Sequence, residues 1–340
     1  MASEPAEPVF DHLSRLTTPT GLFEHARLTT PRVEHGYCLD DAARALVVTC
    51  RQPAPSSLVA GLQDTYLGFT LLAQDDQGRF HNRRRADGTW TDEPSVGDHW
   101  GRAAWALGTV AATATDDAVG GVAAEAAVRA LGCRSPWWHA TAYAALGAAD
   151  LLTVDHSEPV ALAFLEDART ALSAPPVGGW RWPEARLTYA SAVLPEALLA
   201  IGVALDDEAT LRHGLALLGW LVALQTTGDH LSPIPVAGWA PGEELPAFDQ
   251  QPIEVGALAE ACARALAVTG DEAWSRLLDR CVAWFYGVND LGLALYDPTT
   301  GGGNDGLHRY RVNQNQGAES TLAALATIQL ARRAGVAVRA

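Results

Sequence analysis

The 340-residue chain contains no lysine, so all 24 of its basic residues are arginine. This absence excludes three mechanisms that need an amine: a Schiff base with pyridoxal phosphate, a phosphate-binding loop with its lysine, and a serine nucleophile activated by lysine. A GC-rich genome also replaces lysine by arginine, so the absence excludes chemistry without suggesting any.

Paired cysteines and the common metal motifs are missing as well. The five cysteines, Cys38, Cys50, Cys133, Cys262 and Cys281, are odd in number and form no Cys-x-x-Cys pair, which predicts buried reduced thiols in a cytosolic protein. The chain has no His-Glu-x-x-His motif, no EF-hand order of acids and no Gly-x-Ser-x-Gly elbow. A Gly-rich turn explains Asp297, Asn304 and Asp305 better than calcium does. We therefore expect no metal and no cofactor.

Acidic residues outnumber basic ones, which gives a formal charge of −16 and a pI of about 4.9. This balance argues against binding to nucleic acid or to an acidic membrane surface and leaves neutral ligands open. The start of the chain has no basic segment followed by an apolar one, and no apolar run reaches bilayer-spanning length. We expect a soluble, cytoplasmic protein.

Helical periodicity dominates the chain, and strand-type alternation is nearly absent. The length would allow two domains, but no linker or charge block divides the chain, so we predict a single domain over 1–340. The expected helices cover 9–16, a segment that starts at Asp40, 56–74, 98–113, 119–131, 138–153, 158–173 with Ser157 as its N-cap, 188–205, 207–226, 252–269, 271–287 and 316–334.

Two sorts of helix alternate along the chain. Helices such as 98–113 and 316–334 are rich in Ala and Leu almost all round, whereas 158–173 and 271–287 are amphipathic. The first sort suits a helix covered on all sides, and the second suits a helix that faces water. Roughly six such pairs in a closed ring would give an all-α (α/α)6 toroid, because an all-helical repeat buries its apolar faces against its neighbours.

Four polar junctions precede helices of the covered sort. They are Gly36-Tyr37-Cys38-Leu39-Asp40-Asp41, Gly97-Asp98-His99-Trp100-Gly101-Arg102, Phe248-Asp249-Gln250-Gln251-Pro252-Ile253-Glu254 and Asn313-Gln314-Asn315-Gln316-Gly317-Ala318-Glu319-Ser320. In a ring they would gather at one end. Exposed N–H groups at helix starts favour negative charge there.

Carboxylates at this rim are candidates for acid–base catalysis. The first candidates are Asp41 and Asp98, with Glu254 as a substitute for either. Each has a structural alternative, because Asp40 and Asp41 could cap a helix or pair with Arg44, and Asp98 could pair with Arg102. Four clusters on one rim, with aromatics and amides beside them, are harder to explain by capping.

Aromatic and amide side chains at the same junctions favour a sugar ligand, because rings pack on flat C–H faces and amides bind hydroxyl groups. Trp180-Arg181-Trp182 is the best single candidate for a sugar platform, with core packing as its alternative; for Trp137 and Trp138 core packing is favoured. The full set of candidate binding residues is His35, Tyr37, Asp40, Arg44, His99, Trp100, Arg102, Trp180, Arg181, Trp182, Asp249, Gln250, Gln251, His308, Asn315, Gln316 and Glu319.

At these four junctions the sequence resembles a bacterial family of (α/α)6 proteins that is similar to the six-hairpin glycosidases and is often described as glycosyltransferase-associated. The resemblance spans about Phe10 to Leu330. It implies a carbohydrate substrate and a possible glycosyltransferase partner. Where the family pattern has Asn, an acid and Asp-Asn, this chain has Ala42, Gly97 and Ala190-Ser191, which favours a changed substrate or diminished activity.

These observations predict a glycoside hydrolase in which one carboxyl group protonates the leaving oxygen and another activates water. Inversion would need about 6.5–9.5 Å between the two groups, and retention about 5 Å. One alternative is a non-catalytic glycan-binding or scaffold protein that acts beside a glycosyltransferase. Another is a sugar epimerase or isomerase, which would be favoured if His99 and His308 faced each other across the mouth.

Overall fold

The structure is a computed structural model that describes residues 7–173 and 180–335. Within these ranges the chain forms twelve α-helices and one short 3-10 helix, Val33–His35. The α-helices are α1 (Asp11–Leu16), α2 (Leu39–Cys50), α3 (Ser57–Ala73), α4 (Asp98–Thr113), α5 (Asp117–Leu131), α6 (Trp138–Leu152), α7 (Pro159–Leu172), α8 (Val193–Ala204), α9 (Glu208–Leu224), α10 (Pro252–Thr269), α11 (Glu272–Phe285) and α12 (Ala318–Arg333).

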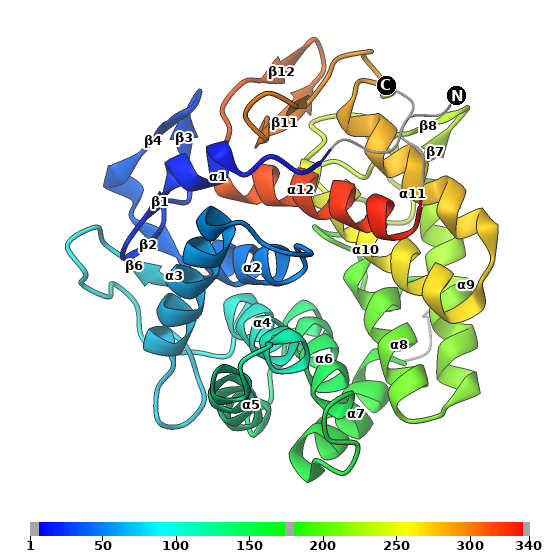
Figure 1. Ribbon diagram of the computed structural model, residues 1–340. Helices are drawn as coiled ribbons and strands as arrows, with labels where there is room; N and C mark the ends of the chain where they lie inside the picture. The colour runs from blue at the N-terminus through cyan, green and yellow to red at the C-terminus, as the bar shows by residue number, and fades with distance from the viewer. Residues whose placement is uncertain (1–6, 174–179, 336–340) are drawn as a thin grey trace.

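The even-numbered helices form a closed inner ring. Each of them packs against the next in the series, and α12 returns to contact α2 (Figure 1). Helices α3, α5, α7, α9 and α11 lie outside, each against the inner helix that precedes it. Helix α1 packs on α12, so the first and last helices of the described chain make the sixth pair. The predicted (α/α)6 toroid is confirmed.

The two predicted sorts of helix occupy the two layers. In α12 the residues from Ser320 to Ala331 are all buried, whereas in α11 the buried residues lie on one face. An inner helix must be apolar all round because it touches both ring neighbours and its own outer partner. Alanine suits this position because it lets the inner helices approach one another closely.

Helices α4 and α6 make the closest of these approaches, through glycine. A Cβ atom added at Gly147 would lie 2.3 Å from the carbonyl oxygen of Ala104, and one added at Gly101 would lie 2.2 Å from that of Ala140. The two backbones are therefore in direct contact.

Some predicted helix boundaries were wrong. Helix α8 begins at Val193 instead of residue 188, because Ala190 has a positive φ of 46° that no right-handed helix accommodates. Helix α7 is capped by Glu158, whose carboxylate accepts the Ala161 N–H, and not by Ser157. Pro159 explains the shift, since proline is favoured at the first helical position.

In residues 7–173 and 180–335, six short antiparallel strand pairs lie in the loops that lead into inner helices, which agrees with the near absence of strand patterns in the sequence. They join β1 (Thr17–Thr18) with β2 (Gly21–Leu22), β3 (Ala26–Arg27) with β4 (Thr30–Pro31), β5 (Tyr37–Cys38) with β6 (Arg83–Arg84), β7 (Thr226–Thr227) with β8 (His230–Leu231), β9 (Tyr296–Asp297) with β10 (Gly302–Gly303), and β11 (Gly306–His308) with β12 (Arg311–Asn313).

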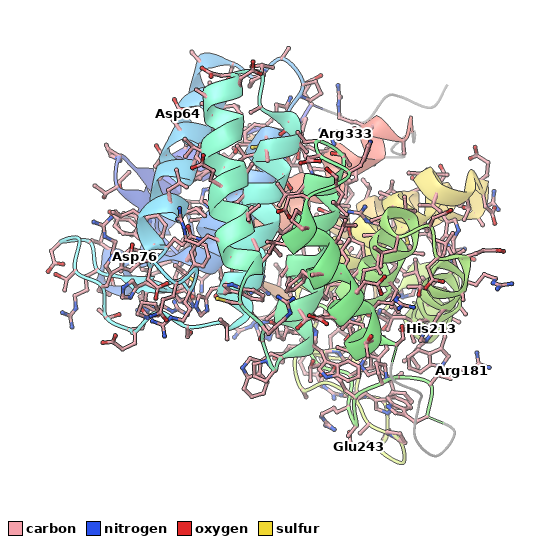
Figure 2. All side chains as sticks on the ribbon, turned by 90° about the horizontal axis from the view of Figure 1, so that it is seen from below. Asp64, Asp76, Arg181, His213, Glu243 and Arg333 are labelled. Atoms are coloured by element: carbon pink, nitrogen blue, oxygen red, sulfur yellow. The ribbon has the colours of Figure 1, made fainter. Side chains whose placement is uncertain are left out.

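The two ends of the ring therefore differ. Short links join each inner helix to its outer partner at one end, where Arg333 lies in Figure 2. The long loops gather at the opposite end, where the same view shows Arg181 and Glu243. We call this second end the mouth.

The cysteines only partly match the expectation of buried thiols. Cys38, Cys262 and Cys281 are buried, but Cys50 and Cys133 are partly exposed, and all five are free. Among the described residues no helix combines the length and the apolar character that a bilayer crossing needs.

Candidate active site

A polar cavity of about 490 Å³ opens at the mouth of the ring, and we call it the mouth cavity. Its lining is Glu24, His25, Cys38, Asp40, Asp41, Arg44, Arg83, Asp98, Arg102, Tyr189, Gln251, Asp305, Asn313, Gly317, Glu319 and Ser320. Carboxylates outnumber arginines in this set. The four junctions seen in the sequence therefore contribute to one cavity, as expected.

Helix starts place the central acids. Asp40 and Asp41 lie in the first turn of α2, Asp98 is the first residue of α4, and Glu319 lies in the first turn of α12. The N–H groups of a first turn have no partner within the helix and carry partial positive charge, which favours carboxylates there. Because inner helices start at the mouth, these side chains reach its lining.

Asp40 is held as a carboxylate by partners from distant segments. It forms an ion pair with Arg102, and the Asn82 amide donates to its second oxygen at 3.0 Å. Burial alone would raise the pKa of Asp40, but the positive charges of Arg102 and Arg44 outweigh it and hold the pKa at about 2. Asp40 thus remains charged and positions Arg102.

Asp41 behaves differently, although it is the next residue. Burial raises the pKa of Asp41 to about 7, and the nearby carboxylate of Glu319 adds to this effect against the opposing charge of Arg44. Arg44 lies between the two acids, 2.7 Å from Asp41 and 2.9 Å from Glu319. A carboxyl group that titrates near neutrality is suited to donate a proton.

Asp98 is partly exposed and lines the same cavity. Within the described part of the chain its carboxylate has no hydrogen bond or ion pair. The pairing with Arg102 at i+4, which was the structural alternative for Asp98, does not form, because Arg102 pairs with Asp40. Asp98 is thus free to contact a ligand or a water molecule.

Glu254 lies outside the mouth cavity. It is buried, and its carboxyl oxygen accepts the Ala190 N–H at 2.7 Å. Burial raises the pKa of Glu254 to about 8. The structure thus gives Glu254 a role in holding the loop before α8, at one of the positions where the chain departs from the resembled family.

Aromatic rings contact the guanidinium group of Arg102. Its guanidinium carbon lies 4.6 Å from the centre of the Tyr143 ring and 5.6 Å from that of Tyr189, and Tyr189 in turn stacks on His139. Cation–π contacts of this kind fix a desolvated arginine in position. Neither Tyr143 nor His139 was predicted as a site residue from the sequence. Tyr143 lies within the apolar helix α6, and His139 lies in its first turn.

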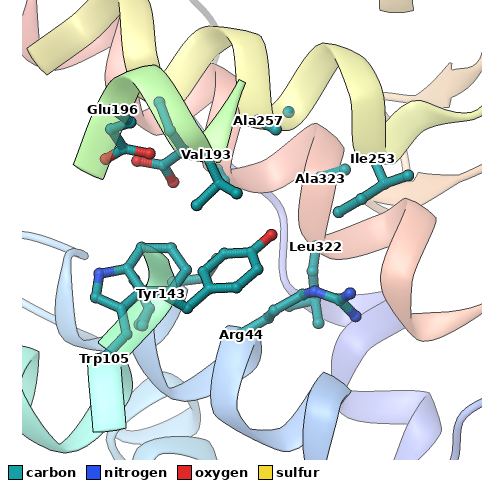
Figure 3. A pocket seen from close by; sticks show the side chains of 14 residues that line it. Arg44, Trp105, Tyr143, Val193, Glu196, Ile253, Ala257, Leu322 and Ala323 are labelled. Carbon is teal, nitrogen blue, oxygen red and sulfur yellow. The ribbon is translucent and has the colours of Figure 1, made fainter. Parts of the chain in front are cut away.

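Beneath the mouth cavity a smaller pocket of about 50 Å³ lies on the axis of the ring. All six inner helices contribute to it, and Figure 3 shows Arg44, Tyr143 and Glu196 among its side chains. Arg44 also lines the mouth cavity, so it forms the floor between the two. The pocket is large enough for a water molecule but not for a sugar ring.

Of the residues predicted from the sequence, Asp40, Asp41, Arg44, Asp98, Arg102, Gln251 and Glu319 line the mouth cavity. Others are core residues outside its lining: Tyr37, His99, Trp100, Trp182, Gln250 and Gln316 are all buried. The His99 ring bonds to the Phe80 carbonyl at 3.0 Å, and the Gln250 amide donates to the carbonyl of Ala247 at 2.9 Å. The polar atoms of His99 and Gln250 thus form hydrogen bonds to loop backbone and not to groups of the cavity lining.

The predicted tryptophan platform faces inward. Trp180 makes edge contacts with Trp220 and Trp239 at 5.3 and 5.2 Å, and Trp182 stacks on Trp220. Arg181 between them is exposed. The alternative of core packing therefore describes Trp182 better than a sugar contact does. Trp137, for which core packing was favoured, is 62% exposed, and Trp138 is partly buried.

The remaining predicted residues lie elsewhere on the mouth side. His308 and Asn315 line a neighbouring hollow, and His308 pairs with Asp249 at 2.9 Å. His35 is exposed and contacts the His25 ring edge-on. His99 and His308 thus do not face each other across the mouth cavity.

Several lining residues were not proposed as ligand contacts from the sequence. Glu24 and Arg83 pair with each other from separate loops, and Asp305 accepts the Gly317 N–H at 2.7 Å. Burial raises the pKa of Asp305 to about 6. No local signal marks these residues, although the run Arg83-Arg84-Arg85 showed that this loop is charged.

Oxygen or sulfur atoms of Glu24, Cys38 and Asp41 lie within 4.8 Å of one another, the spacing of a possible metal site among the described residues. Arginine already neutralises both acids, through Arg83 and Arg44. Burial raises the pKa of the Cys38 thiol. A cation at this position would have to compete with Arg83 and Arg44 for the carboxyl groups of Glu24 and Asp41.

Neither the comparison with protein-family models nor the comparison with curated proteins finds a match. Solved structures with the same fold do match. The chain is similar to cellobiose 2-epimerase from Bacillus thermoamylovorans B4167, with 10% identity, coverage of 95% of this chain and 96% of that one, and a TM-score of 0.70.

A D-mannose isomerase matches with 10% identity, coverage of 96% and 95%, and a TM-score of 0.68. The cellulase Cel9M of C. cellulolyticum matches with 9% identity, coverage of 92% and 87%, and a TM-score of 0.60. At these identities the likeness establishes the (α/α)6 fold, which this chain shares along nearly its whole length with sugar epimerases and family 9 glycosidases.

Proposed function

We propose that the protein is a carbohydrate-active enzyme that hydrolyses a glycosidic bond in the mouth cavity. The structures that share its fold are named as enzymes acting on sugars. The observation that carries the proposal is local: one cavity is lined by the buried carboxyl group of Asp41, whose pKa is about 7, and by Asp98, which has no hydrogen bond or ion pair among the described residues.

Asp41 acts as the general acid and Asp98 as the general base in this proposal. Asp41 gives its proton to the leaving oxygen as the glycosidic bond breaks. Asp98 takes a proton from the water molecule whose oxygen forms the new bond to the anomeric carbon. Both protons are accounted for, and no cofactor takes part.

The other lining residues position the sugar. Arg44 and Arg102 line the cavity as hydrogen-bond donors, beside the acids Glu319 and Asp40, which can accept from hydroxyl groups. Such paired donors and acceptors match the alternating demands of a sugar hydroxyl, which donates one hydrogen bond and accepts others. Gln251 adds an amide from the start of α10.

The test is release of reducing ends from a panel of neutral oligosaccharides, with thermal shift as the measure of binding. We expect Asp98→Asn to lower the rate by about 10²- to 10⁴-fold while the thermal shift persists. Asp64→Asn, an exposed acid on the outer helix α3, is the matched control (Figure 2). An unaltered rate in Asp98→Asn removes this residue from the mechanism, and binding without release supports the non-catalytic alternative.

A second candidate, epimerisation or isomerisation of a sugar, is favoured by the similarity to the 2-epimerases and by His25 in the cavity lining. Such an enzyme removes a proton next to a carbonyl group, so incubation in D2O would place deuterium on the sugar carbon. Deuterium incorporation without bond cleavage would replace hydrolysis by this reaction. The proposed glycosyltransferase partner also stays a prediction, since none of the structures named above is one.

A further inference from the structure

A second hollow adjoins the mouth cavity and shares Asn313 with it. This outer hollow measures about 770 Å³ and is formed around the β11–β12 hairpin just before α12. Its lining is Leu28, Leu293, Ala294, Asn304, His308, Tyr310, Arg311, Val312, Asn313, Gln314 and Asn315. Its volume lies within the usual range of ligand sites.

The chemistry of the outer hollow differs from that of the mouth cavity. Its lining contains no carboxylate, whereas Asp40, Asp41, Asp98 and Glu319 line the mouth cavity. Amides take their place: Asn304, Asn313, Gln314 and Asn315. His308 in this lining pairs with Asp249, and the other polar side chains are the amides, Arg311 and Tyr310. Such a surface is suited to hold hydroxyl groups through hydrogen bonds.

The amide groups of the outer hollow are partly unused. The side-chain oxygen of Asn315 accepts the Leu28 N–H at 2.9 Å, and the side-chain oxygen of Asn304 accepts from the Gln316 amide at 3.4 Å. These bonds fix the two side chains through their oxygens. Their NH2 groups have no partner in the described structure and are available as donors to a ligand.

Tyr310 supplies an aromatic face beside these amides. It lies at the turn between β11 and β12, and 86% of it is exposed. Leu28 and Leu293 on the same lining are also more than one-third exposed. Exposed apolar surface next to free amide donors is the combination that packs against sugar rings while binding their hydroxyl groups.

We propose that the outer hollow is a distal saccharide subsite, so that the substrate is a neutral oligosaccharide extending from the mouth cavity past Asn313 to Tyr310. This inference rests on the proposed function and specifies its substrate class. Sugar units in the outer hollow contribute binding energy without touching Asp41 or Asp98. Affinity should therefore rise with chain length, whereas a monosaccharide would leave this hollow empty.

The experiment measures dissociation constants by calorimetry for cellobiose, cellotriose and cellotetraose, and for the corresponding manno-oligosaccharides. Tyr310→Ala should weaken the binding of the tetrasaccharide about fivefold to tenfold, as expected for the loss of one ring contact, and should leave the disaccharide unchanged. Tyr310→Phe, which keeps the ring, should behave like the unaltered protein. Trp137→Ala removes an exposed aromatic that lines neither hollow and is the control for position.

The failure of this inference is distinguishable from the failure of the proposed function. Binding of disaccharides with no effect of chain length or of Tyr310→Ala would overturn the distal subsite and leave the proposed function intact. An equal loss for disaccharide and tetrasaccharide would also overturn it, since Tyr310 would then act elsewhere. If no saccharide binds or reacts, both proposals fall.

Discussion

Asp40 and Asp41 are neighbours in the chain, yet their pKa values are displaced in opposite directions, to about 2 and about 7. Both lie in the first turn of the same helix, where Asp41 is buried and Asp40 is partly exposed. The difference comes from their partners: Asp40 pairs with Arg102 and accepts from Asn82, whereas Asp41 shares Arg44 with Glu319. Two adjacent carboxyl groups with separated pKa values provide one permanent charge and one transferable proton.

The pKa of Asp41 sets the expected pH dependence. As a proton donor Asp41 must be protonated, so kcat/KM should fall about tenfold for each pH unit above about 7. The measurement is the pH profile of kcat/KM between pH 5 and 9 on a substrate from the panel. A profile that stays level up to pH 9 would contradict the assignment of Asp41 as the acid.

Arg102→Ala should destabilise the protein strongly at neutral pH. It leaves the partly buried Asp40 charge without its ion-pair partner, which costs up to about 3–5 kcal/mol of unfolding free energy. The pKa of Asp40 is lowered on folding, so its contribution is present above the unfolded value and is lost as the pH falls towards 2. Urea denaturation of Arg102→Ala should therefore show a large loss of unfolding free energy at pH 7 and a smaller loss at pH 3.

Arg181→Ala, which removes an exposed guanidinium, is the control for the Arg102 experiment and should change stability by less than about 0.5 kcal/mol. Equal losses for Arg102→Ala at both pH values would show that lost packing on Tyr143, and not the ion pair, is what Arg102 contributes.

Glu254→Gln should stabilise the protein at alkaline pH. The folded pKa of Glu254 is raised to about 8, so the folded state binds a proton that the unfolded chain has already released, and stability falls as pH rises from about 4.5 to about 8. Glutamine can still accept the Ala190 N–H and carries no charge. The melting temperature of the variant should exceed that of the unaltered protein at pH 8.5 and equal it at pH 5.

The catalytic rate of Glu254→Gln tests whether Glu254 has only a structural role or also the catalytic role predicted for it as a substitute for Asp41 or Asp98. A structural Glu254 predicts that Glu254→Gln keeps kcat within about twofold of the unaltered enzyme. A loss of a hundredfold or more at unchanged stability would instead return Glu254 to the mechanism.

Gly147→Ala should destabilise the contact between α4 and α6. Its new Cβ would lie 2.3 Å from the Ala104 carbonyl oxygen, and overpacking of this kind costs about 1–3 kcal/mol. Gly219→Ala in the outer helix α9 meets nothing within 4 Å and should instead stabilise by up to about 1 kcal/mol. Changes of opposite sign in the free energy of unfolding, measured by chemical denaturation, would confirm the close approach. An unchanged free energy of unfolding in Gly147→Ala would refute it.

The sequence by itself determined the ring. Whether a helix is apolar all round or on one face is written in its own residues, because that pattern follows from how many sides are covered. The same local logic located Asp40, Asp41, Asp98 and Glu319, since acids at helix starts are recognisable from the chain alone. It also limited the chemistry, through the absence of lysine.

Only the tertiary structure decided which of those residues share the cavity and in what state. Arg102 pairs with Asp40, 62 residues away, and not with Asp98 on its own helix. Glu254 accepts a hydrogen bond from the Ala190 N–H in a loop and does not line the mouth cavity. Aromatic and amide side chains such as Tyr37, Trp100 and Gln250 are of the types found in sugar sites, but these three lie in the core. Partner choice and burial depend on contacts between segments far apart in sequence, and these form only when the ring closes.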